Sequence, residues 1–242
     1  MKKTFIIIVG LLLFSCSKNS SDYMELAQLS LDQNEEDKAI KNLELLVKKF
    51  PEDSLASLAQ YKLVNIYKNW KNDPMMVSKA LDKTVKNYPG TVQSKQAAKE
   101  IAGFPEWIIN KAETLRKRKL TKESINNLSY MVIHYPDNFL AAKAQYIIGD
   151  IYMNDLRDFE KALAEYRVVL NDYKGSKEEA LAQFMIGYIY ANVLKDFDKA
   201  RKEYQVFLDS FPKHELYPSV KFEINHLGKD INEIPALKHI TS

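Results

Sequence analysis

The sequence predicts an all-α fold, an array of about five helical hairpins. Glycine (7) and proline (8) are scarce in 242 residues, which favours long helices with few turns. An aromatic residue, usually followed by proline, recurs at regular intervals along the chain, and three of the four intervals are identical. We call this shared interval, the one from Phe50 to Tyr88, the repeat period. A shared period with one insertion of nine residues indicates one structural unit used repeatedly.

The aromatic residues mark the end of the second helix of each unit, because proline cannot continue a helix and forces its predecessor out of helical geometry. The marks are Phe50-Pro51, Tyr88-Pro89, Tyr135-Pro136, Tyr173-Lys174 and Phe211-Pro212. One small or apolar residue lies twelve before each proline position, and two more follow it by four and seven, which defines one helix face. The sets are Ala39, Leu43, Leu46; Val77, Leu81, Thr84; Ser124, Leu128, Met131; Ala162, Tyr166, Val169; and Ala200, Tyr204, Phe207.

The first helix of a unit is clearest in "AQYKLVNIY" (59–67), "AQYIIGDIY" (144–152) and "AQFMIGYIY" (182–190). Gly149 and Gly187 occupy the same slot as Val64 and Ala27. Glycine within a helix costs about 1 kcal/mol, so two aligned glycines predict a close approach by the backbone of a neighbouring helix.

The third unit carries an insertion within residues 91–123. We expect Gly103 and Pro105 to break a helix and a new helix to start at about Glu106. Either the array bends here or an additional helix pads it. A family-specific surface and a tolerated loop extension both remain open.

These patterns resemble tetratricopeptide repeats, on "IIGDIY…KALAEYRVVLNDY" and "MIGYIY…KARKEYQVFLDSFP". The resemblance covers about residues 23–226 and implies a right-handed solenoid. Its units would span about 23–51, 53–89, 91–136, 139–174 and 177–212, with a cap at 215–228 and a tail at 229–242.

The resemblance also implies that first-helix residues line a concave groove. The candidate groove residues are Tyr61, Asn65, Lys68, Lys143, Tyr146, Asp150, Met153, Phe184 and Tyr188. Aromatic rings mixed with amide, carboxylate and ammonium groups suit a peptide ligand. Alternatively, Tyr146 and Phe184 are partly buried between neighbouring hairpins.

The amino terminus predicts export. Lys2 and Lys3 precede the apolar run "FIIIVGLLLF", which is shorter than the ~20 residues that span a bilayer, so residues 1–15 are interpreted as a signal peptide. Leu13 to Cys16 resembles the lipobox of bacterial lipoproteins, which implies lipidation of Cys16. The alternative is an ordinary secretory leader. Several acyl chains on one cysteine would attach the protein durably to a membrane. Some inner-membrane lipoproteins carry Asp where this chain has Ser17, so the same resemblance implies the outer membrane. The protein would lie on its periplasmic face, with a tether at residues 16–22.

Composition and motifs argue against several other functions. The near balance of 35 basic and 32 acidic residues gives no support for a nucleic-acid partner. The single cysteine and four scattered histidines show no metal-ligand spacing, and no catalytic or phosphate-binding motif occurs. We therefore expect no metal, cofactor, small-molecule substrate or enzymatic activity. The run "RKRK" (116–119) is interpreted as a solvated helix end, or as a contact for anionic lipid or an acidic partner segment.

The lipobox, the short tether and "EEDKAIKNLELLVKKFPEDSLASLAQYKLVNIY" resemble the BamD-like family of outer-membrane protein assembly factors. That resemblance implies an envelope scaffold whose partners are a barrel-assembly subunit or unfolded client peptides. A Tol-Pal-linked organiser of the YbgF/CpoB type is an alternative, since "AQYIIGDIY…DFEKALAEYRVVLNDY" resembles its repeats. A peptidoglycan-binding accessory lipoprotein is a third.

Overall fold

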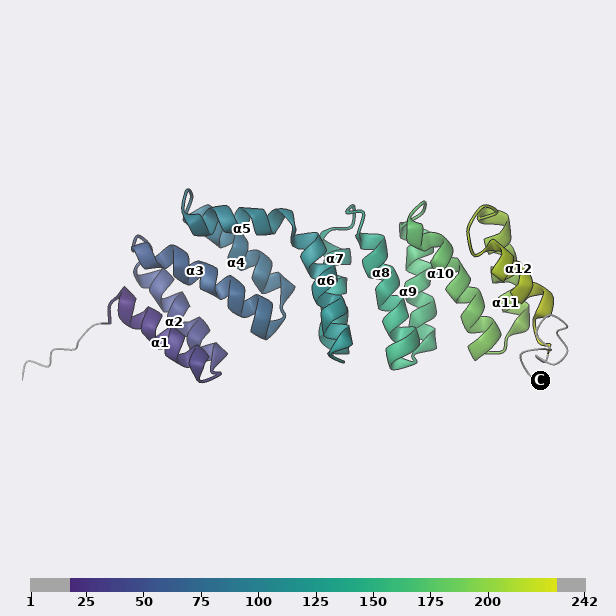
Figure 1. Ribbon diagram of the computed structural model, residues 1–242, viewed down its shortest axis with the longest axis horizontal. Helices are drawn as coiled ribbons and strands as arrows, with labels where there is room; N and C mark the ends of the chain where they lie inside the picture. Colours follow the sequence, from purple (N-terminus) through teal and green to yellow (C-terminus); the bar gives the residue numbers. More distant parts are fainter. Residues whose placement is uncertain (1–17, 230–242) are drawn as a thin grey trace, which may run out of the picture. The chain divides into compact units, whose positions relative to one another are not determined.

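The computed structural model describes residues 18–229, and within this range the fold is all-α (Figure 1). The leader 1–15, Cys16 and most of the tail lie outside the described residues. The helices are α1 (Ser20–Asp32), α2 (Glu36–Lys49), α3 (Ser54–Ile66), α4 (Pro74–Asn87), α5 (Val92–Ala102), α6 (Phe104–Lys117), α7 (Thr121–His134), α8 (Ala141–Ile151), α9 (Phe159–Asp172), α10 (Lys177–Tyr188), α11 (Phe197–Ser210) and α12 (Tyr217–His226). Three π-helical segments, η1 (Tyr67–Lys71), η2 (Tyr152–Leu156) and η3 (Ile189–Val193), extend α3, α8 and α10.

The chain forms two compact units, which contain residues 1–71 with 79–98, and residues 72–78 with 99–242. We number the hairpins 1 (α1–α2), 2 (α3–α4), 3 (α6–α7), 4 (α8–α9) and 5 (α10–α11). In the second unit consecutive hairpins stack, because α7 packs on α8, α9 on α10 and α11 on α12. Within each unit the hairpins pack as the sequence predicts, and the predicted all-α fold of helical hairpins is confirmed.

The core lies where the period places it. All fifteen predicted second-helix residues, three from each hairpin, are completely buried. The second helices also end directly before their aromatic marks, for example at Lys49 before Phe50 and at Ser210 before Phe211. Both predictions are confirmed.

The turn between the two helices has a left-handed residue at the same position in all five hairpins. One residue in left-handed conformation, with φ between 52° and 63°, lies five residues before the first core residue of each second helix. These residues are Asn34, Asn72, Lys119, Arg157 and Lys195. A common turn fixes the register from which the first helices can be compared.

The first helices differ by one residue in that register. The slot residue Ala27 lies seven residues before its turn, and the buried Ala112, which we assign to this slot in hairpin 3, has the same spacing. The slot residues Val64, Gly149 and Gly187 lie eight residues before their turns. Hairpins 2, 4 and 5, which have the longer spacing, are the ones that carry η1, η2 and η3. Since a π-turn contains one more residue than an α-turn, each π segment absorbs the additional residue without moving the core.

The prediction that a neighbouring helix backbone approaches Gly149 and Gly187 was wrong. The rings of Tyr166 and Tyr204, from the second helix of the same hairpin, lie over Gly149 and Gly187. A Cβ atom would lie 2.8 Å from the Tyr166 ring at Gly149 and 2.5 Å from the Tyr204 ring at Gly187. The glycines make room for a side chain and not for a helix backbone.

The third repeat, which carries the insertion, contains an additional helix, α5, before its hairpin. The chain breaks at Gly103 as predicted, but α6 begins at Phe104 and not at Glu106. Pro105 falls in the first turn of α6, where its missing N–H costs nothing. Helix α1 starts at Ser20, inside the segment 16–22 that the sequence analysis assigned to a tether, and Asn19 caps it.

Candidate functional site

Two of the predicted groove residues, Lys143 and Asp150 on α8, form ion pairs with residues of α6. Lys143 Nζ lies 3.0 Å from Glu113 Oε1, and Arg116 lies 2.6 Å from Asp150 Oδ2 and 2.5 Å from Asp155 Oδ2. Partial burial opposes the charge of Arg116, but the hydrogen bonds to Asp155 and Asp150 prevail and raise its pKa above the ordinary value. Arg116 of the "RKRK" run is therefore held by ion pairs, while Lys117, Arg118 and Lys119 are exposed.

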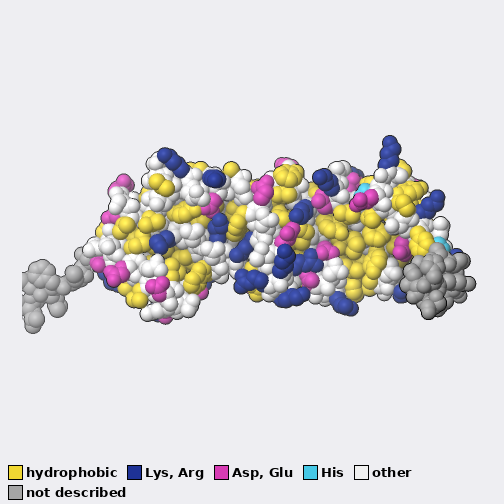
Figure 2. Space-filling model, in the orientation of Figure 1, with side chains coloured by type: hydrophobic (Ala, Val, Ile, Leu, Met, Phe, Trp, Pro, Cys, Tyr) yellow, Lys and Arg dark blue, Asp and Glu magenta, His cyan; other side chains and the backbone are white. Residues whose placement is uncertain are grey.

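Towards the C-terminus the same surface becomes aromatic. The rings of Phe184 and Tyr188 on α10 are 6.2 Å apart, and those of Phe222 and His226 on α12 are 4.2 Å apart. Tyr188 and Phe222 are each 36% exposed. Figure 2 shows hydrophobic side chains gathered over α8 and α10, and basic side chains gathered over α6. We call Tyr146, Phe184, Tyr188, Phe222 and His226 the aromatic face.

Sequence reasoning missed Phe222 and His226. They stand one repeat period after Phe184 and Tyr188, so α12 repeats the first-helix pattern of hairpin 5. The repeat period was the available signal, but it was not extended into the cap. Val220 and Ile224, on the buried side of α12, belong to the same core cluster as Tyr204 and Phe207.

The aromatic face rests on the two buried tyrosines. The Tyr146 ring is 5.4 Å from the Tyr166 ring, and the Phe184 ring is stacked 6.1 Å from the Tyr204 ring. Tyr146 and Phe184 are therefore half-buried and still reach the surface. Burial, together with the carboxylates of Asp150 and Glu178, raises the pKa of Tyr146 to about 12. Its phenol is uncharged at neutral pH and can donate a hydrogen bond.

Other candidates lie elsewhere. Met153 is 8% exposed and packs in the core cluster of Tyr166 and Ile186, so its prediction as a groove residue was wrong. It lies in η2, where the π-turn changes the direction of side chains relative to an α-helix. Tyr61, Asn65 and Lys68 lie on α3 and η1 of the first unit, where Asn65 is exposed and the other two are half-buried.

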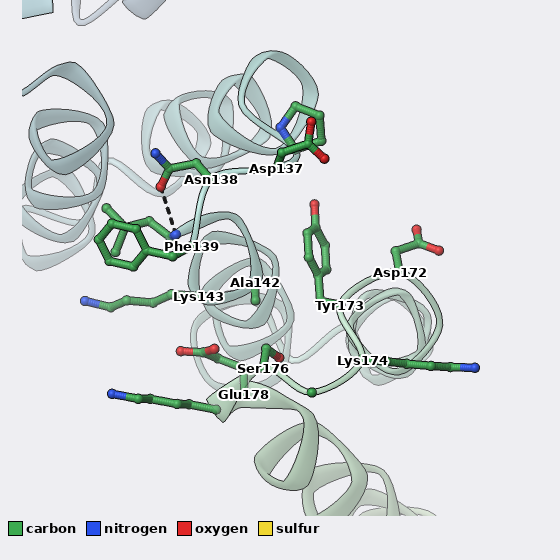
Figure 3. Close-up of a pocket in the computed structure, with 14 residues that line it drawn as sticks. Asp137, Asn138, Phe139, Ala142, Lys143, Asp172, Tyr173, Lys174, Ser176 and Glu178 are labelled. Atoms are coloured by element: carbon green, nitrogen blue, oxygen red, sulfur yellow. Dashed lines mark hydrogen bonds between the residues drawn. The ribbon is translucent and has the colours of Figure 1, made fainter. Parts of the chain in front are cut away.

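A pocket of about 690 Å³ lies beside the aromatic face, between the α7–α8 and α9–α10 loops. Its walls include Phe139, Lys143, Tyr173 and Glu178. In Figure 3, Phe139 and Lys143 extend to one side of the pocket, and Lys174 extends to the other. Phe139 is 77% exposed, and Asn138 Oδ1 accepts a hydrogen bond from the Leu140 N–H, which fixes the loop. The pocket combines an apolar ring with charges of both signs.

Residues 18–229 contain no cluster of three His, Cys, Asp or Glu side chains arranged to hold a metal ion. None of the helices described is long and apolar enough to cross a membrane.

The tetratricopeptide repeat family model matches residues 23–53, 143–176 and 181–214. These three segments are similar to tetratricopeptide repeats. The matched segments fall on hairpins 1, 4 and 5, and the last two carry most of the aromatic face. Such repeats are typically protein-binding scaffolds without catalytic activity.

The chain is similar to three solved structures. A tetratricopeptide repeat protein from Parabacteroides merdae is 13% identical, with a TM-score of 0.36 and coverage of 85% of this chain and 73% of that one. YrrB, described as a repeat protein with an unusual peptide-binding site, is 19% identical, with a TM-score of 0.39 and coverage of 84% and 92%. MamA from Desulfovibrio magneticus is 17% identical, with a TM-score of 0.37 and coverage of 81% and 97%. No curated protein matches the sequence.

Proposed function

We propose that this protein is a non-enzymatic scaffold that binds a segment of a partner protein on the aromatic face. The observation that carries the proposal is the pairing of exposed rings on α10 and α12, which the repeat period places at equivalent positions. Aromatic side chains that are partly buried by their own fold lose little conformational freedom on binding, and they dominate the energetics of interfaces.

The neighbouring charges limit where the partner lies. Between α6 and α8 the surface groups already neutralise each other, so a ligand there would have to break the ion pairs of Arg116 and Lys143. On α10 and α12 a ligand covers apolar rings at no such cost. The expected ligand is a peptide segment with two or more apolar side chains. The polar end of this segment would bind in the pocket that includes Phe139.

A pull-down with matched variants tests this function. Tyr188→Ala and Phe222→Ala remove exposed rings and should reduce recovery of protein partners from detergent-solubilised outer membrane by about tenfold or more. Val206→Ala removes another exposed apolar side chain, 48% exposed on α11 and outside the aromatic face, and should recover partners like the wild type. Circular dichroism checks that all variants remain helical. Equal recovery by all three variants would refute the proposal.

The finer proposal is a lipoprotein of the outer membrane, anchored at Cys16 with its repeats in the periplasm, that acts in β-barrel assembly in the manner of the BamD-like family. The residues before Cys16 and the opening hairpin support it. Palmitate labelling of the wild type, with loss of both label and membrane fraction in Cys16→Ala, is the expected result. A Cys16→Ala variant that stays in the membrane pellet would overturn the anchor.

The captured partner distinguishes the alternatives. An Omp85-type barrel supports the assembly role, Tol-Pal components support an envelope organiser, and glycan strands without protein support a peptidoglycan-binding lipoprotein. The last outcome would also contradict binding of a protein segment.

A further inference from the structure

An arginine side chain that is 46% exposed bridges hairpins 4 and 5. Arg167 Nη2 on α9 lies 2.5 Å from Glu203 Oε1 on α11, and Arg167 also bonds to Tyr190 in η3. Gln183 on α10 donates to the other oxygen of the Glu203 carboxylate at 2.8 Å and to the Glu203 carbonyl at 2.9 Å. The carboxylate is therefore satisfied at both oxygens, and the guanidinium lies between three helical segments of one junction.

The junction between hairpins 3 and 4 repeats this arrangement one repeat period earlier. Gln145 on α8 donates to both the carbonyl and one carboxylate oxygen of Glu165 on α9, as Gln183 does to Glu203. Tyr152 is the counterpart of Tyr190.

The lysines beside these tyrosines are repeated as well. Lys161 pairs with Asp158 and lies 5.3 Å from the centre of the Tyr152 ring. Lys199 pairs with Asp196 and lies at the same distance from the Tyr190 ring. Both lysines thus have partners already and do not replace the arginine.

The two junctions differ at the position of Arg167. Ser129 on α7 stands one repeat period before Arg167 and is too short to reach the carboxylate. A pocket of about 180 Å³ is found here, lined by Ile125, Ser129, Val132, Ile133, Gln145, Ile148, Tyr152 and Glu165. Within residues 18–229, Glu165 has no ionic partner, and only one of its carboxylate oxygens accepts a hydrogen bond. The second oxygen corresponds to the one that Arg167 binds on Glu203.

We propose that this pocket binds the guanidinium group of an arginine side chain from a partner protein. A guanidinium presents several N–H donors in a planar fork, which suits the second carboxylate oxygen of Glu165, and Tyr152 lines the same pocket. Ile125 and Val132 offer apolar surface to the methylene stem, and the flanking Ile133 is 70% exposed.

An adjoining pocket extends the site along the partner chain. It has about 310 Å³, shares Ile125 and Tyr152 with the first, and includes Leu156. Leu156 is 48% exposed and can cover an apolar residue next to the arginine. The site shares no residue with the aromatic face. Binding at one of the two surfaces can therefore be lost while binding at the other remains.

The test uses N-acetyl-L-arginine methylamide as the probe and methyl resonances of Ile125, Val132 and Ile148 as the readout. The wild-type protein should show saturable shifts at these methyl groups. Ser129→Arg supplies the missing guanidinium from within the chain and should abolish the shifts. Glu165→Gln should weaken binding roughly tenfold, because a charge-assisted hydrogen bond is lost. N-acetyl-citrulline methylamide, which has the same shape without the charge, should not bind.

The reciprocal variant sharpens the test. Arg167→Ser empties the other junction, and this variant should bind two probe molecules, the second one reported by Ile186. Unchanged binding by Ser129→Arg would overturn the proposal, as would equal binding of the citrulline probe or no saturable shift in the wild type. Circular dichroism checks the fold of Arg167→Ser, and if that variant unfolds, the Ser129→Arg result alone decides.

Discussion

Hairpins 4 and 5 fill the slot between their two helices differently from hairpins 1, 2 and 3. Gly149 and Gly187 lie beneath the rings of Tyr166 and Tyr204, whereas the other three hairpins have alanine or valine in the slot and leucine at the second-helix position. Those residues are Ala27, Val64 and Ala112, with Leu43, Leu81 and Leu128. All ten positions are buried. A small residue with a large one fills the space as well as two residues of intermediate size.

The difference has a functional consequence. A tyrosine ring at the second-helix position gives Tyr146 and Phe184 an aromatic surface to lie on, with ring centres 5.4 and 6.1 Å apart. A leucine offers no such ring. The glycine–tyrosine pairs thus build the support for the aromatic face, and the comparison can be broken by substituting their members.

Among the substitutions compared at neutral pH, the largest effect is expected for Gly187→Ala. The new Cβ would lie 2.5 Å from the Tyr204 ring, so the ring must move within a closed core. We expect a loss of about 2–3 kcal/mol in the free energy of unfolding, after the gain in helix propensity is subtracted. Urea denaturation measures it. Gly149→Ala, with its Cβ at 2.8 Å, should lose less.

A second substitution provides the control for Gly187→Ala. Tyr204→Leu in the same chain recreates the alanine–leucine pair of hairpin 1 and should restore part of the stability. A Gly187→Ala protein as stable as the wild type would show that the ring is free to move, and the comparison would then lose its basis.

The buried glutamines give the next effect. Gln183 makes two hydrogen bonds to Glu203, at 2.9 and 2.8 Å, whereas the equivalent Gln60 of hairpin 2 makes one long bond of 3.4 Å to the Ala80 carbonyl. Gln183→Ala should lower the free energy of unfolding by about 2 kcal/mol and Gln60→Ala by about 1 kcal/mol. Thermal denaturation of both variants measures the difference, and a larger loss for Gln60→Ala would contradict the ranking.

High pH should destabilise hairpins 4 and 5 through their tyrosines. Burial raises the pKa of Tyr146 to about 12 and those of Tyr166 and Tyr204 further, from an ordinary value of 10.0. The unfolded chain therefore ionises first, so stability is fully present below about pH 10 and falls above it, by roughly 1 kcal/mol per pH unit for each tyrosine. The double variant Tyr166→Phe with Tyr204→Phe should show a shallower fall between pH 10 and 12. An identical slope would contradict the assignment.

The smallest effect on stability is expected when the hydroxyl of Tyr204 is removed and its ring is kept. The hydroxyl oxygens of Tyr166 and Tyr204 are buried and have no hydrogen-bond partner within residues 18–229. Tyr204→Phe removes a desolvated polar group and keeps the ring, so we expect stability equal to the wild type or about 1 kcal/mol higher. Calorimetric melting at neutral pH measures it. A clear loss of stability would mean that the hydroxyl contributes to the core.

Period and helix spacing predicted the core because these properties are local. Residues at offsets of zero, four and seven share a helix face whatever they pack against, and so Ala39, Leu43 and Leu46 could be placed from the sequence. The break at Gly103 was equally local. The three-residue sets and the ends of the second helices were found for the same reason.

Features that depend on register between elements were not predicted. Whether Gly187 meets a backbone or the Tyr204 ring depends on how the two helices are aligned, and the π segment that sets this alignment has no clear sequence signal. The Arg116–Asp150 ion pair and the Ser129 pocket arise between hairpins. Each could be recognised only when equivalent positions were compared across a known stack.

Photo-crosslinking at single positions examines the binding surface in the native envelope. A benzoylphenylalanine residue in place of Tyr188 lies on the aromatic face, and the same residue in place of Val206 lies outside it with similar exposure. We expect position 188 to crosslink a partner protein and position 206 to remain without product. Crosslinking at 206 but not at 188 would contradict binding at the aromatic face.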